Sequence, residues 1–310
     1  MKIAVLGAGS IGSLIAGKLA KVEGNELLIH ARGEHGSIMA VDGIRIQGEE
    51  TFSINSQSII VSLEEVGLYS GWDNQVDLLL ITSKAYDVER LIKCSIKLLH
   101  ETSKVICLSN GLGHVEKCIE YFGPHRVFAA STTHGAWRPN PGIIEWAGKG
   151  VISIGKFGTG PGINDVDSLI EVLEKAELNP KWIDDGGLII WSKVLLNIAI
   201  NPIAALIGCE NGVLLSPQLL EICSEIMFEG AKIAKQEMVK LPPDLELQKQ
   251  LEFVLQTTSK NYCSMLQDVK KGKRTEIEFL NQAIVERAER YGISTPRNNM
   301  LTELIKAINS

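Results

Sequence analysis

The first part of the chain alternates short apolar runs with stretches whose apolar residues recur at helical spacing. The predicted strands are residues 3–6, 27–30, 76–82, 105–108 and 127–131, and the predicted helices between them are 11–21, 88–99 and 115–122. An alternation of strands and helices is typical of a parallel sheet that is covered by helices on both faces. The pattern therefore predicts an α/β domain.

Two stretches depart from this alternation. Residues 43–61 show short runs of alternating polarity, which predict a hairpin-like insertion. Residues 139–162 are rich in glycine and proline, with short strand signals at 143–146 and 151–154. A helix at 166–176 and a short strand at 181–183 then close the predicted first domain.

From about Leu188 onward the strand signals stop and helical periodicity dominates. The predicted helices are 188–207, 216–240, 245–271, 276–291 and 297–308, with prolines or glycines at most of their ends. Thr275 and Glu278 fit a capping box, which predicts a helix that has Thr275 as its N-cap. We therefore predict a doubly wound, Rossmann-like α/β domain over 1–185 and an all-α domain over 186–310.

Composition narrows the class of protein. A length of 310 residues favours two domains, at roughly 150 residues each, and 45% apolar with 22% charged residues is ordinary for a soluble protein. The net charge of −6 argues against a nucleic-acid partner. No apolar run reaches the roughly 18 residues of a membrane span, and the apolar start is too short for a signal peptide.

Cysteine usage points to a reducing compartment. The six cysteines form no C-x-x-C pair, and most lie in apolar runs, as buried free thiols do. We therefore expect a cytoplasmic protein that binds neither membranes nor nucleic acids and holds no metal.

A glycine motif follows the first predicted strand. Gly7-Ala8-Gly9-Ser10-Ile11-Gly12 matches G-x-G-x-x-G, ends a strand and opens a helix. The first glycine permits the tight turn, the second lets a pyrophosphate approach the backbone, and the third lets helix and strand pack closely. The pyrophosphate would lie at a helix N-terminus, which favours anions. The alternative is a plain glycine-rich turn.

The end of the second strand bears on the choice of cofactor. An NAD site usually has Asp or Glu there, to bond the ribose hydroxyl. This chain instead has His30-Ala31-Arg32, and the guanidinium of Arg32 could bind an adenosine 2′-phosphate through two hydrogen bonds. The sequence thus favours NADP (NADPH), and the alternative is a solvated surface arginine.

Three polar residues share one face of the first helix after the boundary. Lys193, Asn197 and Asn201 are spaced four residues apart, so they drift by only about 40° per step along the helix. The rest of that helix is apolar, which indicates burial and requires partners for the polar stripe. A cleft that holds a polar substrate would supply them. Alternatively, Lys193 reaches water and the asparagines bond to backbone.

Two loops after strands carry further candidates. Lys84 follows the strand at 76–82 and Asn110 follows the strand at 105–108, and loops at the carboxyl ends of parallel strands surround the ligand crevice. Glu276 would lie in the first turn of the capped helix, where the dipole favours a carboxylate. Taken singly, each of these could be a surface lysine, a turn asparagine or a helix-terminus charge.

Taken together, these segments resemble the ketopantoate reductase (2-dehydropantoate 2-reductase) family almost end to end. The resemblance rests on their order and separation along the chain. The segments are Gly7–Gly12, Ser83-Lys84-Ala85, Asn110-Gly111-Leu112-Gly113, Lys193-x-x-x-Asn197-x-x-x-Asn201-Pro202, Asn211-Gly212, Ser264-Met265-Leu266-Gln267-Asp268 and Arg274–Asn281.

The resemblance implies a fold and a reaction. It implies a Rossmann-like domain, a helical domain like the C-terminal domain of 6-phosphogluconate dehydrogenase, and an active site between the two. NADPH would reduce a small 2-oxo acid, ketopantoate, in pantothenate and coenzyme A biosynthesis. Lys193 would act as the general acid, with Glu276 as its partner on the substrate hydroxyl side.

The resemblance also implies binding roles. The implied substrate ligands are Asn110, Asn197, Asn201, Asn211 and Ser264. The implied cofactor ligands are the residues of the Gly7–Gly12 loop together with Arg32, Lys84, Asn110 and Glu276.

The sequence leaves two alternatives open. A related NAD(P)-dependent dehydrogenase could act on another 2-oxo or 3-hydroxy acid. A non-catalytic regulator that senses NADPH would keep Gly7–Gly12 but would need neither Lys193 nor Glu276. A helical domain with apolar faces would also permit a homodimer.

Overall fold

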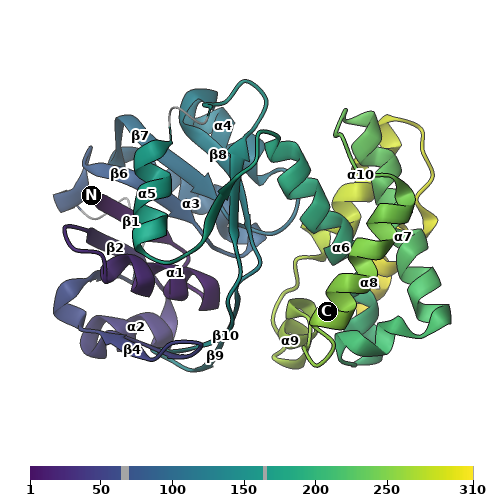
Figure 1. Ribbon diagram of the computed structural model, residues 1–310, viewed down its shortest axis with the longest axis horizontal. Helices are drawn as coiled ribbons and strands as arrows, with labels where there is room; N and C mark the ends of the chain where they lie inside the picture. The colour runs from purple at the N-terminus through teal and green to yellow at the C-terminus, as the bar shows by residue number, and fades with distance from the viewer. Residues whose placement is uncertain (64–69, 163–165, 310) are drawn as a thin grey trace. The chain divides into compact units, whose positions relative to one another are not determined.

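The apolar runs of the first half pair into one sheet in the computed structural model, which describes residues 1–63, 70–162 and 166–309 (Figure 1). In sheet order the strands are β12 (Pro180–Trp182), β11 (Ile152–Lys156), β8 (Val127–Thr132), β7 (Leu99–Cys107), β6 (Val76–Ile81), β1 (Lys2–Leu6), β2 (Glu26–His30) and β5 (Ile60–Ser62). Neighbouring strands are parallel except β11 and β8, which are antiparallel. The predicted α/β class is confirmed.

The strand order reverses between β1 and β6. From β1 the chain runs outward through β2 to β5, returns to β6 and then runs outward the other way through β7 and β8. Leu6 pairs with Ile81, so the loops that follow β1 and β6 begin side by side. Such a switch point, at the carboxyl ends of parallel strands, is where open α/β sheets bind ligands.

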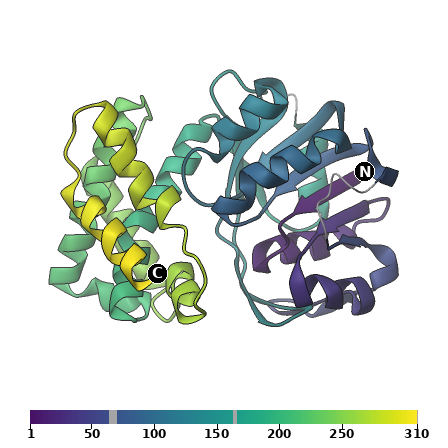
Figure 2. The same cartoon turned by 180° about the vertical axis from the view of Figure 1, so that it is seen from behind.

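Helices cover both faces of this sheet. They are α1 (Ser10–Ala20), α2 (Gly33–Asp42), α3 (Val88–Ser95), α4 (His114–Phe122) and α5 (Asp167–Lys175), and the short 3₁₀ turns among them are η1 (Ser56–Ser58), η3 (Ser70–Trp72), η4 (Ala85–Asp87), η5 (Ile96–Leu98) and η6 (Pro124–Arg126). Helices α1 and α5 lie on one face, and α3 and α4 on the other (Figures 1 and 2). Leu14 of α1 and Leu169 of α5 share one buried apolar cluster with Val5 of β1.

A second, four-stranded sheet was not predicted. It has the order β4 (Phe52–Ile54), β3 (Ile44–Gly48), β10 (Ile143–Gly148) and β9 (Gly135–Asn140). The predicted hairpin is the antiparallel β3–β4 pair, but β3 also pairs in parallel with β10, which is far away in sequence. Helix α2 was missed as well, because Gly33 and Gly36 weaken its helical pattern.

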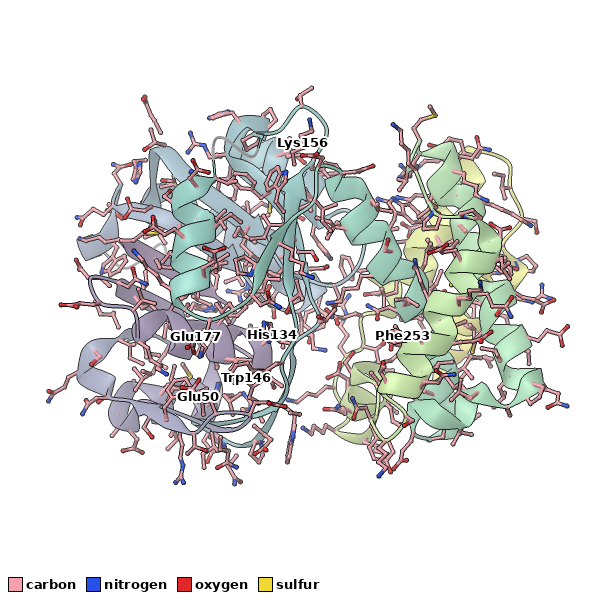
Figure 3. All side chains as sticks on the ribbon, in the orientation of Figure 1. Glu50, His134, Trp146, Lys156, Glu177 and Phe253 are labelled. Carbon is pink, nitrogen blue, oxygen red and sulfur yellow. The ribbon has the colours of Figure 1, made fainter. Side chains whose placement is uncertain are left out.

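A buried lysine joins α1 to its surroundings. Lys18 is 1% exposed and bonds to Glu50 at 2.7 Å and to Glu177 at 2.5 Å, with its ammonium 5.2 Å from the centre of the Trp146 ring. Burial alone would lower the pKa of Lys18, but the two carboxylates outweigh it and raise that pKa. Figure 3 shows Glu50, Glu177 and Trp146 gathered with His134 in this part of the structure.

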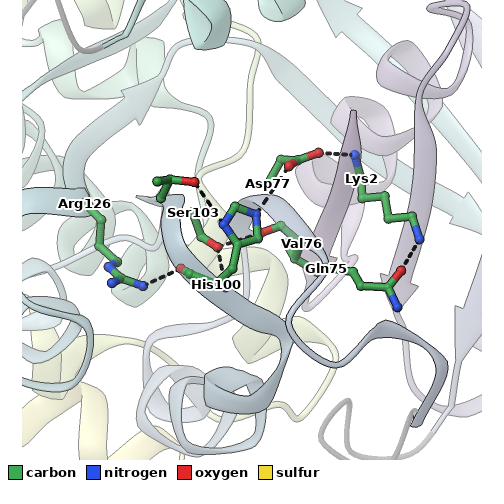
Figure 4. A network of polar contacts seen from close by, with 8 residues as sticks. Lys2, Gln75, Val76, Asp77, His100, Ser103 and Arg126 are labelled. Carbon is green, nitrogen blue, oxygen red and sulfur yellow. Dashed lines mark hydrogen bonds and ion pairs between the residues drawn. The ribbon is translucent and has the colours of Figure 1, made fainter.

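A network of polar contacts connects the strands at the edge of the large sheet where β1, β6 and β7 begin (Figure 4). Asp77 accepts hydrogen bonds from the backbone of Lys2 at 2.7 Å and contacts the ring of His100 at 3.3 Å. The backbone of His100 donates to Ser103 and accepts from Arg126, both at 2.8 Å. These contacts join the starts of β1, β6 and β7, at the edge opposite to the predicted cofactor loops.

The chain forms two compact units. The N-terminal unit comprises Met1–Ser109 and Gly113–Ile189, and the helical unit comprises Asn110–Leu112 and Ile190–Ser310. The elements after the sheet are α6 (Gly186–Ile207), η8 (Asn211–Leu215), α7 (Pro217–Gln236), α8 (Asp244–Thr257), α9 (Ser264–Lys270), η9 (Ile277–Phe279), α10 (Asn281–Arg290) and α11 (Pro296–Ile308). The prediction of an all-α second half is confirmed.

Helix α6 forms the apolar centre of the helical unit. A Cβ atom at Gly230 of α7 would lie 2.6 Å from Ile198 and 2.9 Å from Leu195, so α7 packs tightly against α6 at this glycine. By length and composition alone, α6 could cross a membrane, and it is the one helix in the described ranges with this property. Its most apolar window is 67% buried within the protein, as for the core helix of a globular fold.

Two predicted helices were wrong in detail. Residues 245–271 form α8 and α9 separately, because the carbonyls of Ser259 and Asn261 between them accept from the amides of Gly212 and Asn211. Thr275 does not cap a helix: its amide donates to Asn309, and the next α-helix begins only at Asn281.

Candidate active site

The glycine motif forms the turn between β1 and α1. Gly7 has a φ of +80°, and a Cβ there would lie 2.3 Å from the Cβ of Ser83. The amides of Gly7 and Ala8 donate to the carbonyl of His30 at 3.1 and 2.9 Å. Only glycine fits this turn, because any side chain would collide with the loop after β6.

The other two glycines have different surroundings. A Cβ at Gly12 would lie 2.3 Å from the hydroxyl of Thr82, whereas a Cβ at Gly9 would meet nothing within 4 Å. Gly9 therefore borders open space at the start of α1, where no side chain of the described ranges caps the first turn. Exposed N–H groups and the positive end of the dipole at this point suit a pyrophosphate.

A buried histidine supports this loop from α2. The amide of Gly142 donates to Nδ1 of His35 at 2.9 Å, so the ring proton is on Nε2, which donates to Ser13 Oγ at 2.9 Å. Ser13 in turn donates to the carbonyl of Ala8 at 3.3 Å. Burial, aided by Arg138, lowers the pKa of His35 to about 4, which keeps the ring neutral at physiological pH. The sequence did not reveal His35, because α2 itself was missed.

The predicted adenosine side of the site contains an acidic residue, Asp87, that the sequence pattern did not indicate. Arg32 directly follows β2, and Lys84 directly precedes η4 after β6. The guanidinium of Arg32 pairs with the carboxylate of Asp87, the last residue of η4. The feature of the sequence that could have indicated this pair is the position of Asp87, three residues after Lys84 in the same loop.

The polar stripe lies on α6, within the helical unit. Lys193 and Asn197 are partly buried, and Asn201 is 7% exposed. Burial lowers the pKa of Lys193 to about 8, and the carboxylate of Glu276 opposes this shift. Glu276 itself is 5% exposed and lies just before η9. Glu276 thus lies near enough to Lys193 for its charge to raise that pKa, although the helix predicted to carry Glu276 begins five residues later.

Asn110 joins this pair. Its amide donates to Glu276 Oε2 at 3.4 Å, and the amide of Leu112 donates to the carbonyl of Phe279 at 3.0 Å. Gly111, with a φ of +100°, lets the two backbones meet, since a Cβ there would lie 2.6 Å from the carbonyl oxygen of Phe279. Residues 110–112 therefore dock on η9 and place an amide beside the Glu276 carboxylate.

The predicted substrate ligands Asn201, Ser264 and Asn211 have different surroundings. Cys263 donates to the carbonyl of Asn201 at 3.5 Å, which links the end of the stripe to exposed Ser264, the first residue of α9. Asn211 instead bonds to Thr258, at the end of α8, at 3.0 Å. The role of Asn211 as a substrate ligand stays a prediction.

Asn281 supports the stripe and was missed as well. Pro202 has no N–H, so α6 lacks the hydrogen bond that residue 202 would donate to the carbonyl of Ile198. The side-chain amide of Asn281 donates to that carbonyl at 3.1 Å and to Asn298 at 3.0 Å. The presence of Pro202 inside a predicted helix could have indicated that the Ile198 carbonyl needs a donor from another element.

Family comparisons cover nearly the whole chain. The family model described as "Ketopantoate reductase PanE/ApbA" matches residues 3–159, and the one described as "Ketopantoate reductase PanE/ApbA C terminal" matches residues 187–309. The first match includes the glycine loop, and the second includes Lys193 and Glu276.

Individual relatives agree with these matches. A 2-dehydropantoate 2-reductase of Pyrococcus horikoshii is 35% identical, over 100% of this chain and 98% of its own. A D-mandelate dehydrogenase solved with NADH and anilino(oxo)acetate is 26% identical, with a TM-score of 0.90, and covers 100% of this chain and 98% of its own. A ketopantoate reductase of the same family from Ralstonia eutropha is 26% identical with a TM-score of 0.86, over 100% and 98%.

Proposed function

Because the chain belongs to the ketopantoate reductase family, we propose that it reduces 2-dehydropantoate to pantoate with NADPH. The observation that carries this proposal is the cluster of Lys193, Glu276 and Asn110 in the helical unit. A lysine whose pKa is set by burial and by one carboxylate is a suitable acid for a carbonyl reduction.

Lys193 serves as the general acid. When bound, NADPH supplies a hydride to the keto carbon, and negative charge develops on the keto oxygen. The ammonium of Lys193 stabilises that charge as it develops and then donates its proton to the oxygen. With a pKa of about 8, Lys193 is mostly protonated at pH 7 and yet is a stronger acid than a lysine in water.

The neighbours of Lys193 orient the substrate. Glu276 keeps Lys193 protonated and accepts a hydrogen bond from the substrate hydroxyl, and Asn110 holds the Glu276 carboxylate in place. Asn197, Asn201 and Ser264 offer amide and hydroxyl donors for the carboxylate and the keto group. These are the groups that a small hydroxylated 2-oxo acid presents.

The N-terminal unit binds the cofactor. The open space at Gly9 and the first turn of α1 receive the pyrophosphate. Arg32 receives the 2′-phosphate that distinguishes NADPH from NADH, and Lys84 lines the same edge of the sheet. The neutral ring of His35 keeps the glycine loop in shape.

We place this reaction in the cytoplasm. None of the six cysteines forms a disulfide within the described residues, and Cys107, Cys118, Cys223 and Cys263 are buried, which fits a protein that folds under reducing conditions.

A second candidate is a dehydrogenase of a different 2-oxo acid. The D-mandelate dehydrogenase that shares this fold, with a TM-score of 0.90, was solved with the 2-oxo compound anilino(oxo)acetate. Lys193 and Glu276 would serve that reaction equally, so the two candidates differ in what surrounds the 2-oxo acid group. A third reading, a regulator without catalysis, requires no lysine with a lowered pKa.

The test is oxidation of NADPH by the purified full-length protein with a panel of 2-oxo acids. We expect 2-dehydropantoate to have the highest kcat/KM, and Lys193→Ala to lower kcat by about 10²–10⁴, the usual contribution of a general acid. Lys232→Ala, at an exposed lysine of α7, is the matched control. Preference for an aromatic 2-oxo acid would support the second candidate, and NADPH binding without turnover would support the regulator.

A further inference from the structure

One carboxylate bridges two arginines next to the predicted adenosine site. Oδ2 of Asp87 pairs with the guanidinium of Arg32, and Oδ1 lies 3.4 Å from the guanidinium of Arg90. The Asp87 side chain is 14% exposed, against 55% for Arg32, so the acid is the enclosed partner and the arginine is the accessible one.

The sheet topology brings these groups together. Arg32 follows β2, whereas Asp87 ends η4 after β6 and Arg90 lies in the first turn of α3. Because β1 lies between β2 and β6, the pair of Arg32 and Asp87 spans the carboxyl end of β1, where the glycine loop begins. An acid from the loop after β6 therefore pairs with the arginine that follows β2, although β2 itself ends without an acid.

This arrangement bears directly on a 2′-phosphate. A phosphate and a carboxylate accept the same hydrogen bonds from a guanidinium, so Asp87 occupies donors of Arg32 that the phosphate requires. A phosphomonoester also carries about −1.5 to −2 charges at neutral pH, which the Asp87 carboxylate repels. The free 2′-hydroxyl of NADH is uncharged and has no need of the Arg32 donors, so the pairing of Arg32 with Asp87 leaves the binding of NADH unchanged.

We propose that Asp87 sets the cofactor preference of this enzyme, because its carboxylate competes with the 2′-phosphate for Arg32 and thereby admits NADH alongside NADPH. The proposal rests on the cofactor site of the proposed function. The opposite arrangement, in which Asp87 orients Arg32 toward the phosphate, predicts an effect of opposite sign.

The experiment measures binding without any turnover. The full-length protein is titrated calorimetrically with adenosine 2′,5′-bisphosphate and with 5′-AMP, which differ only in the 2′-phosphate. We expect Asp87→Asn to tighten binding of the bisphosphate about tenfold, the worth of about one charge-assisted hydrogen bond, and to leave 5′-AMP within about twofold. Asp87→Glu, which keeps the carboxylate, should restore the wild-type ratio.

Two further variants distinguish the effect of the Arg32–Asp87 ion pair from a general effect of negative charge near Arg32. Glu34→Gln removes an acid two residues from Arg32 that, within the described residues, makes no ion pair with it, and should leave the ratio of the two affinities within about twofold. Arg32→Ala should abolish the advantage of the bisphosphate over 5′-AMP. Thermal melting of each variant confirms that it is folded.

The outcomes are decisive and distinct from those of the activity test. Unchanged or weaker binding of the bisphosphate by folded Asp87→Asn overturns the proposal, and so does a Glu34→Gln variant that behaves like Asp87→Asn. If Asp87→Asn tightens the bisphosphate while no 2-oxo acid is reduced, the selectivity role stands and the proposed reaction fails.

Discussion

At the scale of the residue, two opposing influences determine the pKa of Lys193. Burial favours the neutral amine, while the Glu276 carboxylate favours the ammonium, and the resulting pKa is about 8. The reduction requires the ammonium, so the rate should fall as the pH rises through this value. The carboxylate that opposes burial thus determines how far above neutrality the enzyme works.

We expect Glu276→Gln to move the alkaline limb of the rate profile to lower pH. The substitution removes the negative charge that raises the pKa of Lys193, so the ammonium loses its proton at a lower pH than in the wild type. The measurement is kcat for 2-oxo acid reduction between pH 6 and 10. Glu278→Gln, at an acid that pairs with Arg274, is the control and should leave the limb in place. An alkaline limb that keeps its pH or moves to higher pH in Glu276→Gln would contradict the role of Glu276 as the group that raises the pKa of Lys193.

Side-chain periodicity predicted some site residues and left others hidden. The i, i+4, i+8 spacing of Lys193, Asn197 and Asn201 is visible in the sequence because one helix carries all three. Asp87 and His35 act through contacts with Arg32 and Ser13 from other elements, and no spacing encodes such contacts. Their roles follow from tertiary structure.

At the scale of the element, α6 lacks one backbone hydrogen bond, and a side chain that is distant in sequence replaces it. The carbonyl of Ile198 has no donor from Pro202, and the amide of Asn281 supplies one. Asn281 and Asn298 are 0% exposed, and Asn298 also bonds to Glu229 at 2.8 Å. This network joins α6, α10, α11 and α7 within the helical unit.

We expect Asn281→Ala to destabilise the helical unit by about 3 kcal/mol. It leaves the Ile198 carbonyl and the Asn298 oxygen buried without their donor, at about 1–3 kcal/mol for each group. The measurement is urea unfolding followed by circular dichroism. Asn299→Ala, at an exposed asparagine next in the sequence to Asn298, should change stability by less than about 0.5 kcal/mol. Equal stability of the two variants would show that the network contributes little.

Element boundaries were predictable where the pattern is local. The strands β1, β2 and β6 and the helices α1, α7 and α11 follow from apolar runs and from periodicity. The capping box at Thr275 failed because burial of Glu276 and Ile277 holds this segment in a 3₁₀ turn against residues 110–112. The second sheet escaped because β3 and β10 pair across about a hundred residues of chain.

At the scale of the whole molecule, the order of elements was enough to predict the fold class, since strand–helix alternation and then helices alone admit few architectures. The membership of Asn110–Leu112 in the helical unit was not predictable. Those residues look like an ordinary loop after a strand. Their contacts with Glu276 and Phe279 show where they belong.

We expect Gly111→Ala to reduce both stability and turnover. The new Cβ would meet the Phe279 carbonyl at 2.6 Å, at a φ of +100°, so the loop must leave η9 and carry Asn110 away from Glu276. Stability should fall by about 2 kcal/mol or more, and kcat should drop at least about tenfold. Gly113→Ala is the control, because its φ is +92° but nothing lies within 4 Å of its Cβ. Equal effects in both would assign the loss to backbone strain alone.

The three residues that the helical unit takes from the middle of the N-terminal sequence have a consequence for inheritance. A single crossover near codon 190 between two related genes would pair residues 110–112 of one parent with the η9 segment of the other. The bond from Leu112 to Phe279 joins backbone atoms and would survive such an exchange, whereas Asn110 and Glu276 meet through their side chains. Recombinants would keep their architecture, but they would keep their chemistry only where the two parents supply matching side chains at positions 110 and 276.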